Sequence, residues 1–128
     1  MVNGLKIRSE RKEDYKIVEE MTRKAFYNLY IPGCVEHYLV HIMRSHEDFV
    51  HDLDFVAEIG GKVVGNIMYT KAMLVDEKGN EKQILTFGPL TVDVDHQRKG
   101  IGKKLMAHSF HKAAELGYDT IVIFGNPA

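Results

Sequence analysis

The chain contains no tryptophan, a single cysteine and only three prolines among its 128 residues. The single cysteine, Cys34, excludes a disulfide within the chain and is typical of a reducing compartment, so we expect a cytoplasmic protein. No apolar run approaches the roughly 20 residues that a membrane-spanning helix needs. The N-terminus, MVNGLKIRSERKED, lacks the apolar core of a signal peptide. The sequence therefore predicts no association with a membrane.

An excess of charge of one sign is also missing. Seventeen basic residues nearly balance eighteen acidic ones, and the net charge is −1. A large nucleic-acid interface is therefore not expected. The hydrophobic fraction of 45% is ordinary for a globular protein, and a chain of this length can bury roughly two-thirds of its extended surface. We expect one domain over residues 1–128.

Hydrophobic periodicity divides the chain into strands and helices in the order β-α-α-β-β-β-α-β. Strands are predicted at residues 5–9, 55–59, 63–75, 83–94 and 120–124, and helices at 11–26, 35–43 and 100–116. Ser9 is the predicted N-cap of the first helix, and Gly117 the C-cap of the last. Gly60-Gly61 predicts a tight hairpin turn, and Gly88-Pro89 inside a strand predicts a bulge or a local loss of pairing. The fold class is mixed α/β, with the last two strands parallel.

The most informative stretch is residues 87–102, FGPLTVDVDHQRKGIG. An apolar strand runs into a polar loop and then into a glycine-bearing turn at the start of a helix. The first N–H groups of a helix have no intrahelical partner and lie at the positive end of the helix dipole, so they bind phosphate well. Arg98, Lys99 and Lys103 add positive charge to this turn. The stretch therefore predicts a pyrophosphate site.

This pattern resembles the GCN5-related N-acetyltransferase (GNAT) superfamily over nearly the whole chain. The family's acetyl-CoA motif, Q/R-x-x-G-x-G/A, is matched by Gln97, Gly100 and Gly102, with L-x-V on the preceding strand. The resemblance implies the GNAT fold, in which a bulge splays the fourth strand from the fifth and opens a cleft for the pantetheine arm. It also implies acetyl-CoA as the co-substrate and acetylation of a primary amine.

The resemblance assigns cofactor-binding roles residue by residue. Backbone groups of Leu90, Thr91 and Val92 are expected to pair with the pantetheine and the thioester carbonyl. Gln97 belongs to the motif, and the pyrophosphate is expected on the backbone N–H groups of the turn, which comprises Arg98, Lys99, Gly100, Ile101, Gly102 and Lys103. Asn126 matches a position that often contacts the cofactor, although Asn126-Pro127 also reads as a plain turn.

The reaction needs a neutral amine close to the thioester carbonyl, with no covalent enzyme intermediate. A carboxylate or an ordered water can take the amine's proton, and Asp93 and Glu58 are the candidate carboxylates, with a loop-capping role as the alternative for Asp93. Two other classes stay open: a CoA-binding module without activity, and a structural domain without a ligand. The sequence does not name the acceptor; Tyr27, Tyr30 and Tyr38 lie where the family places that site, with core packing as the equal alternative.

We expect no metal centre. The pairs His37 with His41 and His108 with His111 have helical spacing, but neither has a third ligand at metal-site spacing. Family members usually continue after the fifth strand with a helix and two more strands, whereas this sequence stops at Asn126-Pro127-Ala128. We therefore expect a C-terminally truncated domain of weak activity. The open edge of residues 120–124 then predicts either a homodimer or a frayed strand.

Overall fold

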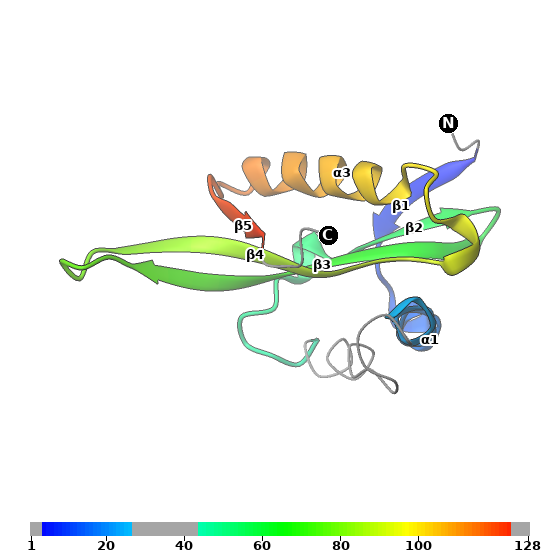
Figure 1. Ribbon diagram of the computed structural model, residues 1–128, viewed down its shortest axis with the longest axis horizontal. Coiled ribbons are helices and arrows are strands. Elements are labelled where there is room, and N and C mark those ends of the chain that lie inside the picture. Colours follow the sequence, from blue (N-terminus) through cyan, green and yellow to red (C-terminus); the bar gives the residue numbers. More distant parts are fainter. Residues whose placement is uncertain (1–3, 27–43, 124–128) are drawn as a thin grey trace.

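A computed structural model describes residues 4–26 and 44–123. Its centre is a sheet in the order β1-β2-β3-β4-β5, and Figure 1 shows α1 and α3 on opposite sides of it. The elements are β1 (Leu5–Ser9), α1 (Tyr15–Phe26), β2 (Phe55–Ile59), β3 (Lys62–Val75), β4 (Glu81–Val92), α3 (Ile101–Glu115) and β5 (Ile121–Ile123). Neighbouring strands are antiparallel from β1 to β4, and β5 is parallel to β4, as predicted. The helix predicted at 35–43 lies outside the described residues.

Alternation of side chains along the strands separates two apolar cores. The core beneath α3 includes Phe55, Ala57, Val64, Ile67, Tyr69, Leu85, Ile101, Leu105 and Ala113. The core beneath α1 consists of Val18, Met21, Phe49, Val56, Val63 and Met68. Because successive residues of a strand point to opposite faces, the sheet is buried on both sides in its middle. Among the described residues, no helix is long and apolar enough to cross a membrane.

The β2–β3 connection is the predicted two-residue turn. Gly60 and Gly61 both have positive φ, 58° and 83°, which a tight hairpin turn of this twist requires. From there β3 runs unbroken to Val75, and the β3–β4 hairpin projects beyond the rest of the sheet (Figure 1). The helix end is also as predicted, because Gly117 adopts φ 95° and its N–H donates to the carbonyl of Ala114 at 3.1 Å.

The start of α1 differs from the sequence prediction. Ser9 is not an N-cap, because it is the last residue of β1 and pairs with Phe55. A short 3-10 turn, Lys12–Asp14, precedes the helix, and the carboxylate of Asp14 accepts a hydrogen bond from the N–H of Arg11 at 2.8 Å. Ser9 is thus used for strand pairing, and the carboxylate of Asp14 makes the capping interaction instead.

The end of β4 also corrects a prediction. Val94 is not a strand residue; it begins the 3-10 turn Val94–His96 and is 48% exposed. The strand ends at Val92 because the chain must turn there toward α3.

Candidate functional site

The bulge at Gly88-Pro89 divides β4 into two parts. Ile67 pairs with Leu90 and Tyr69 with Phe87, so two residues of β4 lie opposite the single Met68 of β3. Before the bulge, β4 pairs with β5 through Leu85, Thr86 and Phe87. Beyond it, residues 90–92 pair only with β3 among the residues that the structure describes. The predicted bulge is therefore confirmed, and it marks the point where the β4–β5 pairing stops.

The open side of residues 90–92 presents specific backbone groups. The N–H of Asp93 donates to the carbonyl of Val64 at 2.8 Å, so Asp93 faces β3. Because backbone groups alternate in direction along a strand, Thr91 also faces β3, whereas Leu90 and Val92 face the open side. The carbonyl of Val92 already accepts a hydrogen bond from Gln97 Nε2 at 3.2 Å. Of the three residues predicted to pair with pantetheine, Leu90 and Val92 have the required direction.

Two glycines let the first turn of α3 lie close to this strand. A Cβ on Gly102 would lie 3.6 Å from Leu90 Cδ2 and 3.8 Å from Val92 Cγ2. A Cβ on Gly65 of β3 would lie only 3.0 Å from Leu105 Cδ1, which is tighter than normal packing allows. Gly102 was predicted from the sequence, whereas Gly65 was not, although a glycine inside an otherwise apolar strand is a recognisable signal.

The turn before α3 has the backbone of an anion site. Arg98, which is not a glycine, has φ 65°, and Gly100 has φ 80°. The first helical hydrogen bond runs from the N–H of Lys104 to the carbonyl of Gly100 at 3.1 Å. The N–H groups of Ile101, Gly102 and Lys103 therefore lie ahead of the helical ladder. Successive N–H groups in such a turn form a concave nest that suits a phosphate.

Positive charge surrounds this nest. The side chains of Arg98, Lys99, Lys103 and Lys104 are all exposed, and none has an ion-pair partner within the described part of the chain. Gly100 has nothing within 4 Å of a built Cβ, so its conformation rather than close packing requires a glycine. The turn and the open strand segment adjoin each other through Gly102, so together they make one elongated candidate site.

The candidate catalytic carboxylates are both engaged. Asp93 Oδ2 lies 2.8 Å from His96 Nδ1, in the turn between β4 and α3. Glu58 on β2 accepts a hydrogen bond from Arg8 Nε at 3.2 Å. Arg8 also binds Asp14 through a 2.7 Å and a 3.0 Å contact, and this hydrogen bonding lowers the pKa of Asp14 below its usual value. The structure thus places Asp93 beside the open strand and Glu58 two strands away from it.

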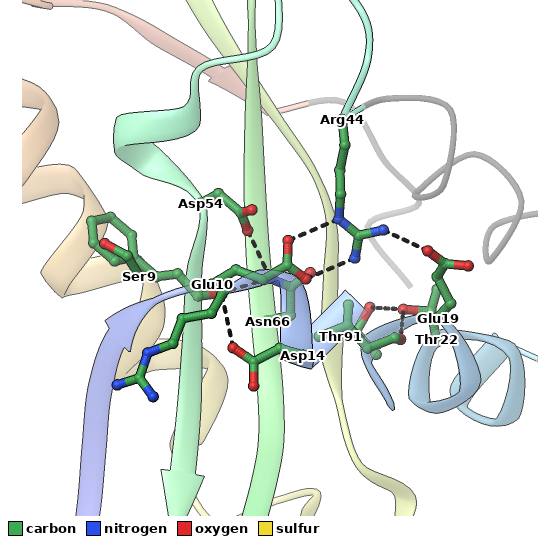
Figure 2. A network of polar contacts seen from close by, with 12 residues as sticks. Ser9, Glu10, Asp14, Glu19, Thr22, Arg44, Asp54, Asn66 and Thr91 are labelled. Atoms are coloured by element: carbon green, nitrogen blue, oxygen red, sulfur yellow. Dashed lines mark hydrogen bonds and ion pairs between the residues drawn. The ribbon is translucent and has the colours of Figure 1, made fainter. Parts of the chain in front are cut away.

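A buried polar network beneath α1 was not predicted from the sequence (Figure 2). Arg44 binds both carboxylate oxygens of Glu10, at 2.8 and 2.7 Å, and contacts Glu19 at 2.6 Å. Asp54 accepts a hydrogen bond from Asn66 at 3.1 Å. Burial, followed by a hydrogen bond to Glu10, raises the pKa of Asp54 to about 9. Sequence patterns do not reveal such a network, because its members are far apart in the chain.

Thr91 connects this face to the candidate site. Its side chain points toward α1, where its hydroxyl lies 3.4 Å from that of Thr22 (Figure 2). Both residues are buried, with exposures of 1% and 0%. The sequence pattern pointed to the backbone of Thr91, but no sequence signal pointed to Thr22.

The two histidines of the pair at residues 108 and 111 contact different side chains. His108 packs edge-on against the ring of Phe55, with 4.7 Å between the ring centres, and His111 contacts Glu115 at 2.9 Å. Within residues 4–26 and 44–123, no three His, Cys, Asp or Glu side chains lie together as metal ligands would. The remaining candidates lie outside the described residues: His37, His41, Cys34, Tyr27, Tyr30, Tyr38 and Asn126.

The sequence of this chain is similar to those of known acetyltransferases. Residues 23–128 match the family model described as "Acetyltransferase (GNAT) family". The uncharacterized N-acetyltransferase YhbS of Escherichia coli strain K12 is 29% identical over 123 residues, which are 95% of this chain and 68% of the relative.

Solved structures extend the similarity to the fold. A GNAT family acetyltransferase from Brucella melitensis in complex with acetyl-CoA has a TM-score of 0.80 at 28% identity, covering 95% of this chain and 76% of that one. An aminoglycoside acetyltransferase, meta-AAC0020 from an uncultured soil metagenomic sample, in complex with sisomicin, has a TM-score of 0.66 at 25% identity, covering 98% and 80%. The expected fold is therefore confirmed.

Proposed function

The chain belongs to the acetyltransferase (GNAT) family, and from this membership we propose that it binds acetyl-CoA and transfers the acetyl group to a primary amine. The observation that carries the proposal is the continuity of two features. Leu90–Val92, which within residues 4–26 and 44–123 has a strand partner on one side only, leads directly to a phosphate-type nest at Arg98–Lys103. A long ligand with a pyrophosphate at one end and amide groups along an extended arm matches both features.

Each part of the site is assigned one part of the co-substrate. The nest and its basic side chains hold the pyrophosphate. The backbone of Leu90 and the N–H of Val92 pair with the pantetheine amides, as a further strand would. Gln97 holds the carbonyl of Val92 and so fixes the junction between the strand and the turn. Asn126 is proposed as an additional cofactor contact on the resemblance alone.

Acetyl transfer then proceeds by direct attack. The lone pair of the neutral amine forms a bond to the thioester carbon, the carbon–sulfur bond breaks, the nitrogen loses one proton as the amide forms, and the thiolate of CoA takes up a proton. An amine with a pKa near 10.4 is almost wholly protonated at pH 7, so one proton must leave before attack. Oriented N–H donors stabilise the negative charge that develops on the carbonyl oxygen.

Asp93 is the better placed of the two candidates for receiving the amine's proton. It directly follows Val92, whereas Glu58 lies on β2 and is bound to Arg8. If Asp93 has this role, Asp93→Asn lowers kcat while the Kd for acetyl-CoA stays within a few fold. An unchanged kcat would instead assign Asp93 to capping the turn through His96.

Binding and catalysis are tested separately. Acetyl-CoA at about 100 times its Kd should raise the free energy of unfolding by about 2.7 kcal/mol and the melting temperature by several degrees. If neither acetyl-CoA nor CoA shifts the melting temperature of the folded protein, the proposal is wrong. Release of free CoA across a panel of amines, including sisomicin and spermidine, then distinguishes an enzyme from a CoA-binding module without activity.

Two finer proposals accompany this function. The cytoplasm is the proposed location, because the one cysteine suits a reducing compartment. A homodimer is proposed because β5 is the edge strand of the described sheet, and an edge strand offers backbone groups to a partner. Light scattering of the purified chain tests the dimer, since a monomeric mass at micromolar concentration would contradict it.

A further inference from the structure

Beyond the bulge, the segment Leu90–Val92, which is proposed to pair with pantetheine, is not paired on both sides as an inner strand normally is, among the residues that the structure describes. On one side it pairs with β3, and on the other side it has no strand partner among the described residues. Its ligand must nevertheless find Leu90 and Val92 at fixed positions, because a displacement of about 1 Å at a reacting group can cost a hundredfold in rate. Contacts from above and below the sheet must therefore hold the segment.

The contacts from one face come from α3. Leu90 and Val92 point toward this helix and lie in ordinary packing distance of Gly102. These contacts are apolar and therefore have little directional preference. They press the segment against the helix but do not fix its rotation about the strand axis.

The contact from the other face is polar and directional. Thr91 points toward α1, where Thr22 lies with its hydroxyl 3.4 Å away. Thr22 Oγ1 also lies 2.8 Å from the carbonyl of Val18, one helical turn earlier. A carbonyl can only accept a hydrogen bond, so the hydroxyl of Thr22 donates its hydrogen bond to the carbonyl of Val18. The hydroxyl of Thr91 must then be the donor to Thr22.

We infer that Thr22 is a positioning residue for acetyl-CoA binding, which acts by accepting a hydrogen bond from the hydroxyl of Thr91 and so fixing the backbone of Leu90 and Val92 toward the ligand. This inference rests on the proposed function. Thr22 touches neither the co-substrate nor the reacting atoms. Its effect passes through Thr91, whose own backbone groups are turned to β3 and whose side chain is buried.

Three variants separate this role from general stability. Thr22→Val keeps the shape of the side chain but removes the acceptor. Thr22→Ser keeps the hydroxyl and serves as the matched control. Thr91→Val removes the donor from the other end and covers the case in which Thr22→Val does not fold.

The readout compares two ligands on each variant. Acetyl-CoA engages both the strand segment and the nest, whereas adenosine 5′-diphosphate offers only the pyrophosphate end. We expect Thr22→Val and Thr91→Val each to raise the Kd for acetyl-CoA by about two- to tenfold, the range that corresponds to the net contribution of one hydrogen bond. The Kd for adenosine 5′-diphosphate should stay unchanged, and Thr22→Ser should bind both ligands like the wild type.

The double variant gives a second criterion. If both residues act through one hydrogen bond, the Kd of Thr22→Val/Thr91→Val for acetyl-CoA should not exceed the higher of the two Kd values of the single variants. Additive losses, an unchanged Kd in Thr22→Val, or equal losses for both ligands would each overturn the inference. A wild-type chain that binds no acetyl-CoA would instead refute the proposed function on which the inference rests.

Discussion

Asp54 accepts a hydrogen bond from Asn66 Nδ2 at 3.1 Å, and burial together with the nearby carboxyl group of Glu10 raises the pKa of Asp54. Asp54 is only 6% exposed, and the side chain of Glu10 is fully buried. The guanidinium of Arg44 binds Glu10 through both of its oxygens and also contacts Glu19, whereas its influence on Asp54 is only electrostatic. Charge balance therefore favours a neutral Asp54, which keeps its proton and can donate a hydrogen bond to Glu10.

This arrangement predicts a pH dependence of stability. The pKa of Asp54 is raised from 3.8 to about 9 in the folded protein, so the folded state holds a proton that the unfolded state has lost between these values. The stabilising effect of that proton is fully present below the unfolded pKa and is lost as the pH rises toward 9. For one such group the free energy of unfolding falls by about 1.4 kcal/mol per pH unit.

Asp54→Asn tests this prediction, because an asparagine can donate to Glu10 without titrating. We expect the variant to be more stable than the wild type at pH 8 and to lose less stability between pH 5 and pH 8. Urea unfolding at several pH values measures the difference. Asp52→Asn, at an exposed neighbouring position, should keep the wild-type slope. Equal slopes for Asp54→Asn and the wild type would contradict a protonated Asp54.

Removal of Arg44 should destabilise the fold strongly. Arg44→Met leaves the buried carboxylate of Glu10 without the guanidinium that binds both of its oxygens, and the loss of one partner from a buried ion pair typically costs about 3–5 kcal/mol. Arg44→Lys keeps the charge but cannot bind both oxygens of Glu10 in the same way, so we expect an intermediate loss. Chemical denaturation of the three proteins gives the ranking, and a Met variant as stable as the wild type would show that the network contributes nothing.

Gly100→Asp should abolish acetyl-CoA binding while the fold survives. Gly100 has φ 80° and lies in open space at the nest, so an aspartate adds negative charge where the pyrophosphate is proposed. Gly79→Asp is the matched control, because Gly79 has φ 83°, is equally open and lies on the distant β3–β4 turn. Calorimetry should show lost affinity only for the change at residue 100, and affinity retained there would place the phosphates elsewhere.

The two glycines beneath α3 should respond differently to alanine. Gly65→Ala places a Cβ 3.0 Å from Leu105 Cδ1 and 3.1 Å from Ile101 Cγ2, so α3 must shift, at a typical overpacking cost of about 1–3 kcal/mol. Gly102→Ala meets ordinary contact distances and removes a poor helix former, so stability should be unchanged or higher by up to about 1 kcal/mol. Thermal unfolding distinguishes the two, and equal melting temperatures would show that the strand and helix are less closely packed.

Much of the local structure follows from the sequence alone. The Gly60-Gly61 turn, the bulge at Gly88-Pro89 and the helix end at Gly117 were predictable, because each depends on the conformation that one residue type permits. The glycine-bearing turn before α3 was predictable for the same reason, whereas the pyrophosphate site at this turn stays a prediction. Ser9 was misassigned as a helix cap because a local rule competed with strand pairing, and only the sheet register decides such a competition.

The buried polar network and the contact between Thr22 and Thr91 could not be predicted without the tertiary structure. Glu10, Arg44, Asp54 and Asn66 come from four separate segments, and nothing in their local sequence indicates that they meet. Thr22 and Thr91 are 69 residues apart and become neighbours only when α1 crosses beneath β4. The sequence determined which backbone conformations were available to the chain. The folded arrangement decided which polar groups are buried together, because burial depends on contacts between segments that no local pattern encodes.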